Sequence, residues 1–384
     1  MLPAKPSLEL LRSLSDEHVL RELIQARQLT RADLAARTGL SKPTVGESVR
    51  RLAEAGLVAD TGERTPGGRG RGRVGSYYAL AKDAGTALVV SIAPDGVVAE
   101  TVNPWGDTVA RAERMISRPA RPAQVAAALR AAAMRAQQDG GVTTRLAVVS
   151  AADPVERGTG RLIQLPDAPF LLGELSPVEV LTPHVNGPVV VDNDVNWAAR
   201  AEHEHGRAAQ LDDFAYVFLG EGLGCAVVSD GEVRRGHGGL AGEIAHLLTA
   251  GPHGQATRLI EVFADLGLRQ AGSTAIDVDR LLRAATGPGP EAEAAREVMA
   301  GAISGVLAAL VALADPGLVI IGGSWGRHHV IIDAVSTAFA RLPRHVPVRA
   351  AELTDQPSLA GARSDALGRL HAAIVDGPHT LPQT

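Results

Sequence analysis

The chain has 384 residues, 45% of them hydrophobic, which is enough for two or three domains with sizeable cores. It contains one cysteine, Cys225, which excludes a disulfide within the chain and a multi-cysteine metal site. The net charge of −5 is divided unevenly: residues 1–80 hold 13 Lys and Arg against 9 Asp and Glu, and the remainder holds 25 against 34. A basic head on an acidic body suits contact with nucleic acid through the head alone.

The N-terminal sequence and the hydropathy pattern indicate the cellular compartment of the protein. The first residues, MLPAKPSLELL, lack the apolar core of a signal peptide. We find no run of 18 or more apolar residues, so no membrane span is expected. These features predict a cytoplasmic protein.

Three helices are expected at the start of the chain. The first covers residues 8–28 and carries apolar side chains that can pack beneath the next two. Thr30 can cap the second helix, with Asp33 completing a capping box, and Gly39 is a natural left-handed terminator. Ser41 can then cap the third helix. Two such helices joined by a short turn with glycine are the signature of a helix-turn-helix.

The third helix predicts contact with duplex DNA. In a helix-turn-helix the second helix of the pair lies in the major groove, with its N-terminal side chains at base edges. Arginines later in that helix are better placed to meet backbone phosphate. The alternative is a plain three-helix bundle whose polar residues are solvated. The residues of this motif that we assign to DNA binding are Thr30, Ser41, Lys42, Thr44, Arg50 and Arg51.

An arginine–glycine segment follows the three helices and is expected to form a wing. In GGRGRGR, Arg69, Arg71 and Arg73 stand on a glycine backbone with few steric limits. Such an arm can enter a narrow minor groove, where the negative potential attracts guanidinium groups. Residues 74–80 are expected to form the closing strand. The alternative is a disordered basic linker, which would still add non-specific affinity for phosphate.

The rest of the chain alternates strands with helices, which predicts an α/β domain with a mixed sheet. Strands are expected at residues 87–93, 96–103, 107–114, 146–152, 188–194, 214–220, 224–230 and 317–323. Helices are expected at residues 122–138, 195–207, 255–267, 277–285, 290–314, 328–340 and 362–376.

Three segments of this body carry a resemblance to a known family. They are NDVNWAARAEHEHG, GEGLGCAVVSDGEVRRGHGGLAGEIAH and DPGLVIIGG, in this order behind the winged helix. The chain therefore resembles the ROK family of repressors, open reading frames and sugar kinases. The resemblance implies a two-lobed, actin-like ATPase (ribonuclease H-like) fold with a sugar-binding cleft between the lobes. It implies a winged helix-turn-helix domain at residues 1–80 and a ROK domain at 81–384, with lobe 1 at about 85–190 plus 362–376 and lobe 2 at about 191–361.

The resemblance also implies a sugar-binding site. In ROK kinases the aspartate at the position of Asp194 is the general base, and an adjacent carboxamide such as Asn193 can bind a neighbouring hydroxyl without any reaction. Glu243 and His246 bind sugar hydroxyls in the family and face one side if their segment is helical. Glu261 falls where the family has a further sugar-binding glutamate. The alternatives are a capped strand end at the first pair and a surface turn at the second.

Two features of the family are missing from this sequence. The zinc loop that most ROK proteins carry after the histidine contains three cysteines, and no cysteine follows His246, so no zinc is expected. The first phosphate turn is replaced by APDG, in which Asp95 is better interpreted as a hairpin residue. In the second turn, GEGLG, Glu221 replaces a threonine, and an anion there repels a nucleotide phosphate. Because phosphoryl transfer depends on positioning and charge stabilisation, we expect no ATP binding, no cofactor and no enzymatic activity.

These residues predict a sugar-responsive transcriptional regulator, with repression as the expected mode. The head would bind a double-stranded operator in a homodimer or homotetramer. A sugar or sugar derivative in the cleft would close the lobes and lower DNA affinity. One alternative is a regulator with a non-functional pocket, controlled by a partner protein or by oligomerisation. Another is a sugar kinase with an accessory DNA-binding head, which needs the phosphate turns that this sequence lacks.

Overall fold

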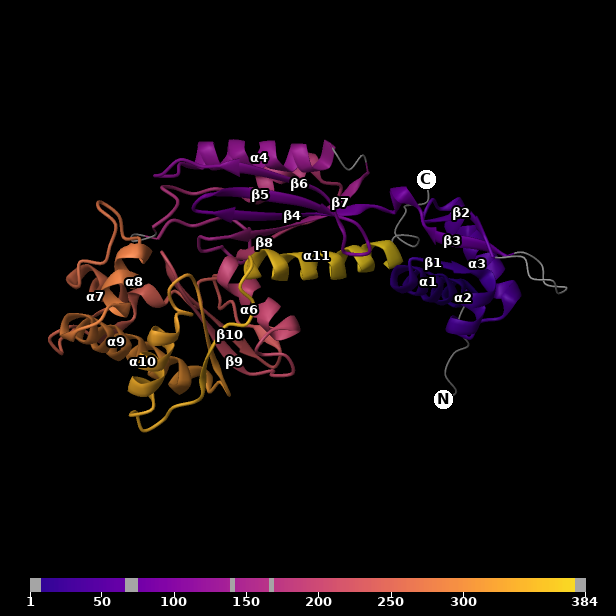
Figure 1. The fold of residues 1–384 in the computed structure, drawn as a ribbon. Coiled ribbons are helices and arrows are strands. Elements are labelled where there is room, and N and C mark those ends of the chain that lie inside the picture. Colours follow the sequence, from indigo (N-terminus) through magenta and orange to yellow (C-terminus); the bar gives the residue numbers. More distant parts are fainter. Residues whose placement is uncertain (1–7, 66–74, 139–141, 166–168, 377–384) are drawn as a thin grey trace.

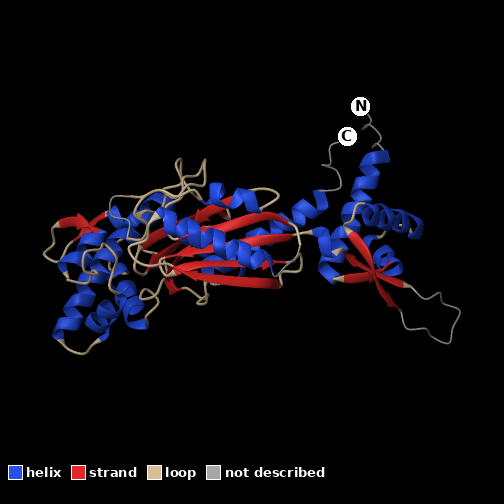
Figure 2. Cartoon of the chain, turned by 90° about the horizontal axis from the view of Figure 1, so that it is seen from above, coloured by secondary structure: helices blue, strands red, loops and turns tan. Residues whose placement is uncertain are grey.

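The computed structural model describes residues 8–65, 75–138, 142–165 and 169–376 of the chain. The molecule is elongated, with an N-terminal head at one end, lobe 1 beside it and lobe 2 beyond (Figure 1). The head packs its helices on a three-stranded sheet of order β1–β3–β2, seen in Figure 2 beside the larger sheets. Its elements are α1 (Leu8–Ala26), β1 (Gln28–Thr30), α2 (Arg31–Thr38), α3 (Lys42–Glu54), β2 (Val58–Arg64) and β3 (Ser76–Leu80).

The helix ends in the head follow from local chemistry. Thr30 and Asp33 form the capping box at the start of α2, and Gly39 ends that helix with a φ of 70°. Ser41 caps α3. These expected limits are confirmed. The first helix is two residues shorter than expected, because Arg27 adopts a φ of 65° and the chain enters β1.

Lobe 1 is a mixed five-stranded sheet with a helix on each face. The strand order is β6–β5–β4–β7–β8, with β4, β5 and β6 antiparallel and β7 and β8 parallel to β4. Side chains alternate along β4: Leu88 and Val90 belong to the core under α4, whereas Ala87 and Val89 belong to the core under α11. The elements are η1 (Lys82–Ala84), β4 (Thr86–Ala93), β5 (Gly96–Val102), β6 (Thr108–Met115), α4 (Pro122–Gln138), β7 (Thr144–Ala151), α5 (Pro177–Leu181), η2 (Thr182–His184), β8 (Val189–Asn193) and α11 (Pro357–Asp376).

Lobe 2 contains a second five-stranded sheet, of order β11–β10–β9–β14–β15. Helix α6 packs on the face that carries Phe214 and Tyr216 of β9, and α7 and α9 pack on the face that carries Val217 and Leu219. The elements are α6 (Asp194–His205), β9 (Phe214–Leu219), β10 (Leu223–Ser229), β11 (Glu232–Val233), η3 (Ile244–His246), β12 (Leu248–Ala250), β13 (Ala256–Arg258), α7 (Leu259–Asp265), α8 (Val278–Thr286), α9 (Pro290–Ala314), β14 (Val319–Gly322), α10 (His329–Phe339) and β15 (Val348–Ala350).

Two expectations for lobe 2 need correction. The helix expected over residues 255–267 is wrong in its first part, where β13 pairs with β12 in a hairpin that Gly251 and Gln255 close by a hydrogen bond of 2.7 Å. Helix α9 also has the length and apolar composition of a membrane span, which our hydropathy argument did not identify. Half of that apolar stretch is buried in lobe 2 against α7, α8 and α10, as in a core helix.

Candidate effector cavity and nucleic-acid interface

The exposed end of α3 is the part of the head that suits contact with DNA. The Ser41 hydroxyl accepts a hydrogen bond from the Thr44 backbone N–H at 3.2 Å, and Ser41 and Lys42 are exposed. Val45 and Val49 are buried and attach the helix to the head core. The free N–H groups of a helix N-terminus favour an anion, and Lys42 adds a positive charge beside them.

Other residues assigned to DNA contact serve the head itself. Thr30 is 5% exposed and caps α2. Arg51 donates from Nε and Nη2 to the buried carboxylate of Asp16 at 3.1 and 2.7 Å. Arg50 is exposed, but it pairs with Glu47 and Glu54 of its own helix. Thr30 and Arg51 are therefore turned into the head, away from any DNA that α3 meets.

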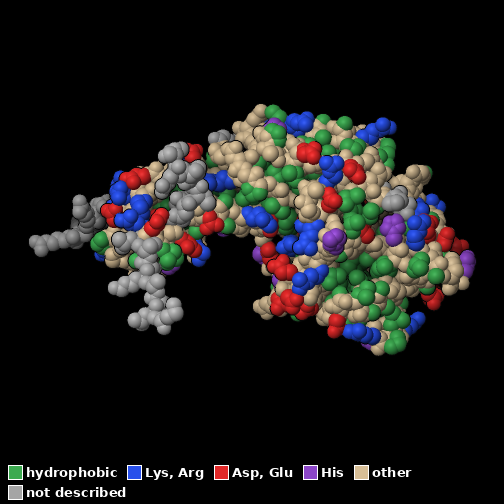
Figure 3. All heavy atoms as spheres, turned by 180° about the vertical axis from the view of Figure 1, so that it is seen from behind, with side chains coloured by type: hydrophobic (Ala, Val, Ile, Leu, Met, Phe, Trp, Pro, Cys, Tyr) green, Lys and Arg blue, Asp and Glu red, His purple; other side chains and the backbone are tan. Residues whose placement is uncertain are grey.

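The described part of the head has no excess of positive charge. It holds nine Lys and Arg and nine Asp and Glu, and Figure 3 shows both signs interspersed on its surface. The net charge of +4 over residues 1–80 therefore comes from Lys5, Arg69, Arg71 and Arg73. These four residues lie outside the described ones, so the wing assignment stays a prediction.

A cavity of about 440 Å³ lies between the two lobes, within the range of roughly 300–1,000 Å³ usual for small-molecule sites. Its walls are partly apolar, with Phe170 and Leu165 on lobe 1 and Leu223 and Ile260 on lobe 2. Cys225 also lines it, and burial raises the pKa of this thiol to about 12, so the sulfur is neutral and a poor nucleophile. The polar lining residues are Asp95, Arg118, Asp153, Asn193, Asp194, Asn196, Glu221, Glu243, His246, Thr274 and Ser324.

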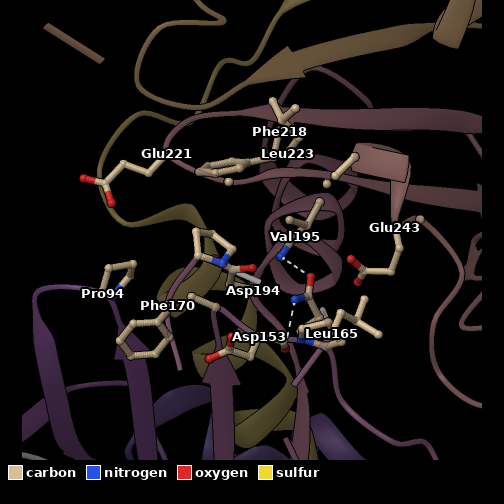
Figure 4. Close-up of a pocket in the computed structure, with 18 of the residues that line it drawn as sticks. Pro94, Asp153, Leu165, Phe170, Asp194, Val195, Phe218, Glu221, Leu223 and Glu243 are labelled. Carbon is tan, nitrogen blue, oxygen red and sulfur yellow. Dashed lines mark hydrogen bonds between the residues drawn. The ribbon is translucent and has the colours of Figure 1, made fainter. Parts of the chain in front are cut away.

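Asn193 and Asp194 line the cavity where β8 passes into α6. The Asn193 side chain caps α6 by accepting the Val195 N–H at 2.9 Å, and its Nδ2 donates to the carbonyls of Ala151 and Asp153. Its polar atoms therefore fix the turn. Figure 4 shows Val195 and Asp153 on either side of this turn. Asp194 begins the helix, and burial raises its pKa to about 7, although backbone N–H groups at the helix start oppose this rise. Near neutral pH Asp194 can thus accept or donate a hydrogen bond.

Glu243 and His246 line the opposite wall of the cavity. Glu243 precedes η3 and His246 ends it, and because residues i and i+3 eclipse in a 3₁₀ turn, the spacing does place both on one side. Burial raises the pKa of Glu243 to about 7, and the charge of Asp194 adds to the rise. In Figure 4 the Glu243 carboxylate points toward the turn that carries Val195.

Asp153 is a cavity residue that the sequence analysis missed. It is 1% exposed, and its Oδ2 has no hydrogen-bond partner among the described residues. Burial raises its pKa to about 7, the Leu171 N–H opposes the rise, and Asp194 and Glu243 add to it. A signal was present: β7 and β8 are parallel neighbours, and carboxyl ends of parallel strands meet at one edge. An acid two residues after β7 therefore lies beside Asn193 and Asp194.

The outer end of the cavity is crossed by an ion pair from lobe 1 to lobe 2. Arg118, between β6 and α4, lies 2.6 Å from Glu221 in the β9–β10 turn and 2.7 Å from Asp95 in the β4–β5 turn. The hydrogen bond to Glu221 is the largest cause that raises the pKa of Arg118. The two turns that correspond to the expected phosphate turns are thus joined by one guanidinium group.

Glu261 is the predicted sugar ligand that the structure does not bring to the cavity. Its Oε1 binds Arg258 at 2.9 Å and Arg269 at 3.1 Å, and its neighbour Ile260 lines the wall instead. The β12–β13 hairpin precedes it, at the position after His246 where most ROK proteins carry the zinc loop. Among the described residues, no group of three His, Cys, Asp or Glu is arranged to hold a metal ion.

Known proteins resemble both parts of this molecule. Residues 12–59 match the winged helix-turn-helix DNA-binding family and residues 102–367 match the ROK family. A ROK family transcriptional regulator, a homolog of the Escherichia coli MLC protein, has a TM-score of 0.65 and 19% identity, covering 96% of this chain and 100% of its own. At this identity the likeness shows the fold alone.

Sugar kinases are similar to the body of the chain. N-acetylmannosamine kinase of Escherichia coli O1:K1 is 31% identical over 204 residues, which cover 50% of this chain and 69% of the kinase. A ROK family glucokinase from Streptomyces griseus, solved with glucose and AMPPNP, is 24% identical with a TM-score of 0.55, covering 73% of this chain and 98% of its own.

A winged helix-turn-helix head on an actin-like, two-lobed body defines a DNA-binding protein built on a sugar-kinase fold. The chain belongs to the ROK family, whose match spans residues 102–367.

Proposed function

We propose that this protein is a transcriptional repressor whose interlobe cavity binds a sugar or sugar derivative as effector and does not transfer a phosphoryl group. The observation that carries the proposal is the union, in one chain, of a DNA-binding head and an acidic interlobe cavity. Asp194 and Glu243 can accept hydrogen bonds from sugar hydroxyls, and Phe170 and Leu223 offer apolar surface to the sugar ring.

The loss of phosphoryl transfer is supported by the outer end of the cavity. A nucleotide phosphate at the β9–β10 turn would meet the carboxylate of Glu221, and Asp95 adds a second negative charge across the gap. Arg118 could neutralise a phosphate only by leaving both partners. Transfer needs a preorganised positive site, and this site is occupied by the protein's own ion pairs.

A continuous path of contacts can carry the state of the cavity to the head. Trp197, one turn after Asp194 in α6, presents its carbonyl to Gly361 of α11 so closely that a Cβ there would collide with it. Further along α11, the His371 ring N–H donates to the Pro104 carbonyl at 2.6 Å. The adjoining Trp105 donates to the carbonyl of Leu23 in α1 at 3.5 Å. Movement of α6 against lobe 1 is therefore transmitted to the helix that supports the head.

The DNA-binding role is tested by replacing Arg69, Arg71 and Arg73 with Ala. Because these residues hold three of the four excess charges of the head, operator affinity in a gel shift should fall at least about 100-fold at low salt. The slope of log affinity against log salt should flatten by about 0.9 for each lost phosphate contact. Unchanged affinity would refute the wing role.

A charge-matched control for the wing variant comes from lobe 1. Arg114 of β6 and Arg130 and Arg135 of α4 are exposed there and lie outside the head. Their triple Ala variant loses the same charge and should keep operator affinity within about threefold, since long-range charge is screened by salt.

The effector role is tested by a thermal-shift screen with sugars, followed by a gel shift with the sugars that bind. A raised Tm together with release of operator supports the proposal. No shift with any sugar would favour the regulator with a non-functional pocket, and ATP consumption with any hexose would favour the kinase.

A further inference from the structure

We propose that the cavity selects sugars carrying a protonated amine over neutral sugars and over sugar phosphates, because three carboxylates line it, the buried Oδ2 of one has no partner among the described residues, and Arg118 is the only lysine or arginine among the described lining residues. This inference rests on the proposed function and names the class of its effector. The three carboxylates belong to Asp153, Asp194 and Glu243, which we call the inner triad.

The inner triad comes from three separate elements that border the cavity. Asp153 follows β7, Asp194 begins α6 and Glu243 precedes η3. The charges of Asp194 and Glu243 both raise the pKa of Asp153, and the charge of Asp194 raises the pKa of Glu243. The fold therefore places three acidic side chains in the lining of one cavity, with Asp153 buried and Asp194 and Glu243 partly exposed.

One carboxylate oxygen of the inner triad is an unsatisfied hydrogen-bond acceptor among the described residues. The Asp153 Oδ2 is buried and has no partner among the described residues. A buried, unpaired acceptor is unfavourable, and a buried, unpaired charge is more so. A ligand that places a hydrogen-bond donor with a positive charge at this oxygen would form the hydrogen bond that the described protein does not provide.

The number of donors separates an ammonium group from a hydroxyl group. An ammonium group carries three N–H donors and a positive charge, whereas a hydroxyl has one donor and no charge. A cavity lined by several carboxylates, with an unpartnered oxygen on Asp153, matches the ammonium group better, and hydrogen bonds between charged groups are roughly twice as strong as neutral ones.

Anionic ligands are disfavoured by the same arrangement. The only Lys or Arg among the described lining residues is Arg118, which already holds Glu221 and Asp95 at the outer end. A phosphate would add negative charge to a cavity with five carboxylates and one committed arginine. A divalent metal is disfavoured because no group of three acidic or histidine ligands among the described residues is arranged to hold one.

The preference is measured by isothermal titration calorimetry of the full chain at about pH 7. The probes are glucosamine, galactosamine and mannosamine, each against its neutral hexose and its hexose 6-phosphate. In at least one set the amino sugar should bind about 10- to 100-fold more tightly than the neutral hexose and the hexose 6-phosphate. This is the difference expected when one hydrogen bond between charged groups replaces one between neutral groups.

A conservative variant links the preference to the inner triad. Asp153→Asn keeps the size of the side chain and removes its charge, so the preference for the amino sugar should fall about tenfold or more. The matched control is Asp230→Asn, because Asp230 is exposed and lies outside the cavity lining. It should leave the preference unchanged, and circular dichroism checks that both variants fold.

The outcomes separate this inference from the proposed function. Equal or tighter binding of the neutral sugar or the phosphate in every set that binds would overturn the inference alone, as would an unchanged preference in Asp153→Asn. No binding by any of the nine probes would overturn the sugar-effector function and the inference with it.

Discussion

At the inner end of the interlobe cavity, Asp153, Asp194 and Glu243 line the wall without an ion pair to a lysine or arginine among the described residues, whereas at the outer end Asp95 and Glu221 share Arg118. Both ends are acidic, so charge alone does not distinguish them. The inner carboxylates are left for a ligand to satisfy, and the outer ones are satisfied by the protein and join the lobes. The inner end of the cavity is thus suited to binding a ligand, and the outer end holds the two lobes together.

The largest expected effect comes from removing an inner carboxylate. Asp194→Ala should weaken sugar binding at least about 100-fold, because charged hydrogen bonds to the ligand are lost. Operator affinity should stay unchanged, because Asp194 begins α6, which lies away from the head in Figure 1. The matched outer variant is Asp95→Ala, which should change sugar affinity less than about threefold because that carboxylate is exposed and bound to Arg118. Equal losses in both variants, measured by calorimetry, would erase the distinction between the two ends.

The second prediction concerns stability and pH. The inner triad has pKa values raised from about 4 to about 7 in the folded chain, so the folded state holds more protons than the unfolded state between these values. The associated stability is fully present below about pH 4 and is lost as pH rises through about 7, so Tm should fall between about pH 5 and about pH 7.5.

Asp153→Asn tests this assignment of the pH effect. It should flatten the dependence of the unfolding free energy on pH by up to about 1.4 kcal/mol per pH unit, since one titrating group is removed. Asp230→Asn serves again as the exposed control. A pH profile of Tm that is identical for wild type and Asp153→Asn would contradict a buried, titrating Asp153.

The smallest effect is expected at the outer end. Arg118→Ala breaks the bridge between the lobes, and because its side chain is 37% exposed the pair is worth at most about 1 kcal/mol. Sugar affinity should fall less than about fivefold at low salt, and the difference from wild type should shrink at high salt. Arg161→Ala is the matched control, because Arg161 pairs with Glu174 and Glu179 within lobe 1. If both variants bind sugar equally well at low salt, the bridge has no role in closure.

The parts of the structure that the sequence predicted are those that local chemistry determines. The caps at Thr30 and Ser41 and the terminator at Gly39 depend on neighbours within a few residues, and all three are in place. The limits of α4 and α9 were also predicted, because a proline begins each and long helical periodicity follows. The family resemblance supplied the lobes and the cleft.

The parts that the sequence did not predict depend on partners far away in the chain. Arg51 pairs with Asp16, 35 residues earlier, and is therefore turned away from DNA. Arg118 meets Glu221, 103 residues later, which no local pattern indicates. The sequence did not identify Asp153 as a cavity residue, because its place there depends on the parallel pairing of β7 with β8.

The apolar core of the head continues without a break into the core between lobe 1 and α11. Leu20 and Leu23 of α1 belong to the same cluster as Val89 of β4 and Leu370 of α11. Head and lobe 1 should therefore melt as one cooperative unit. A fragment that ends near residue 80 would expose a face that the body normally covers, and the isolated head would be a poor substitute for the intact chain in studies of operator recognition.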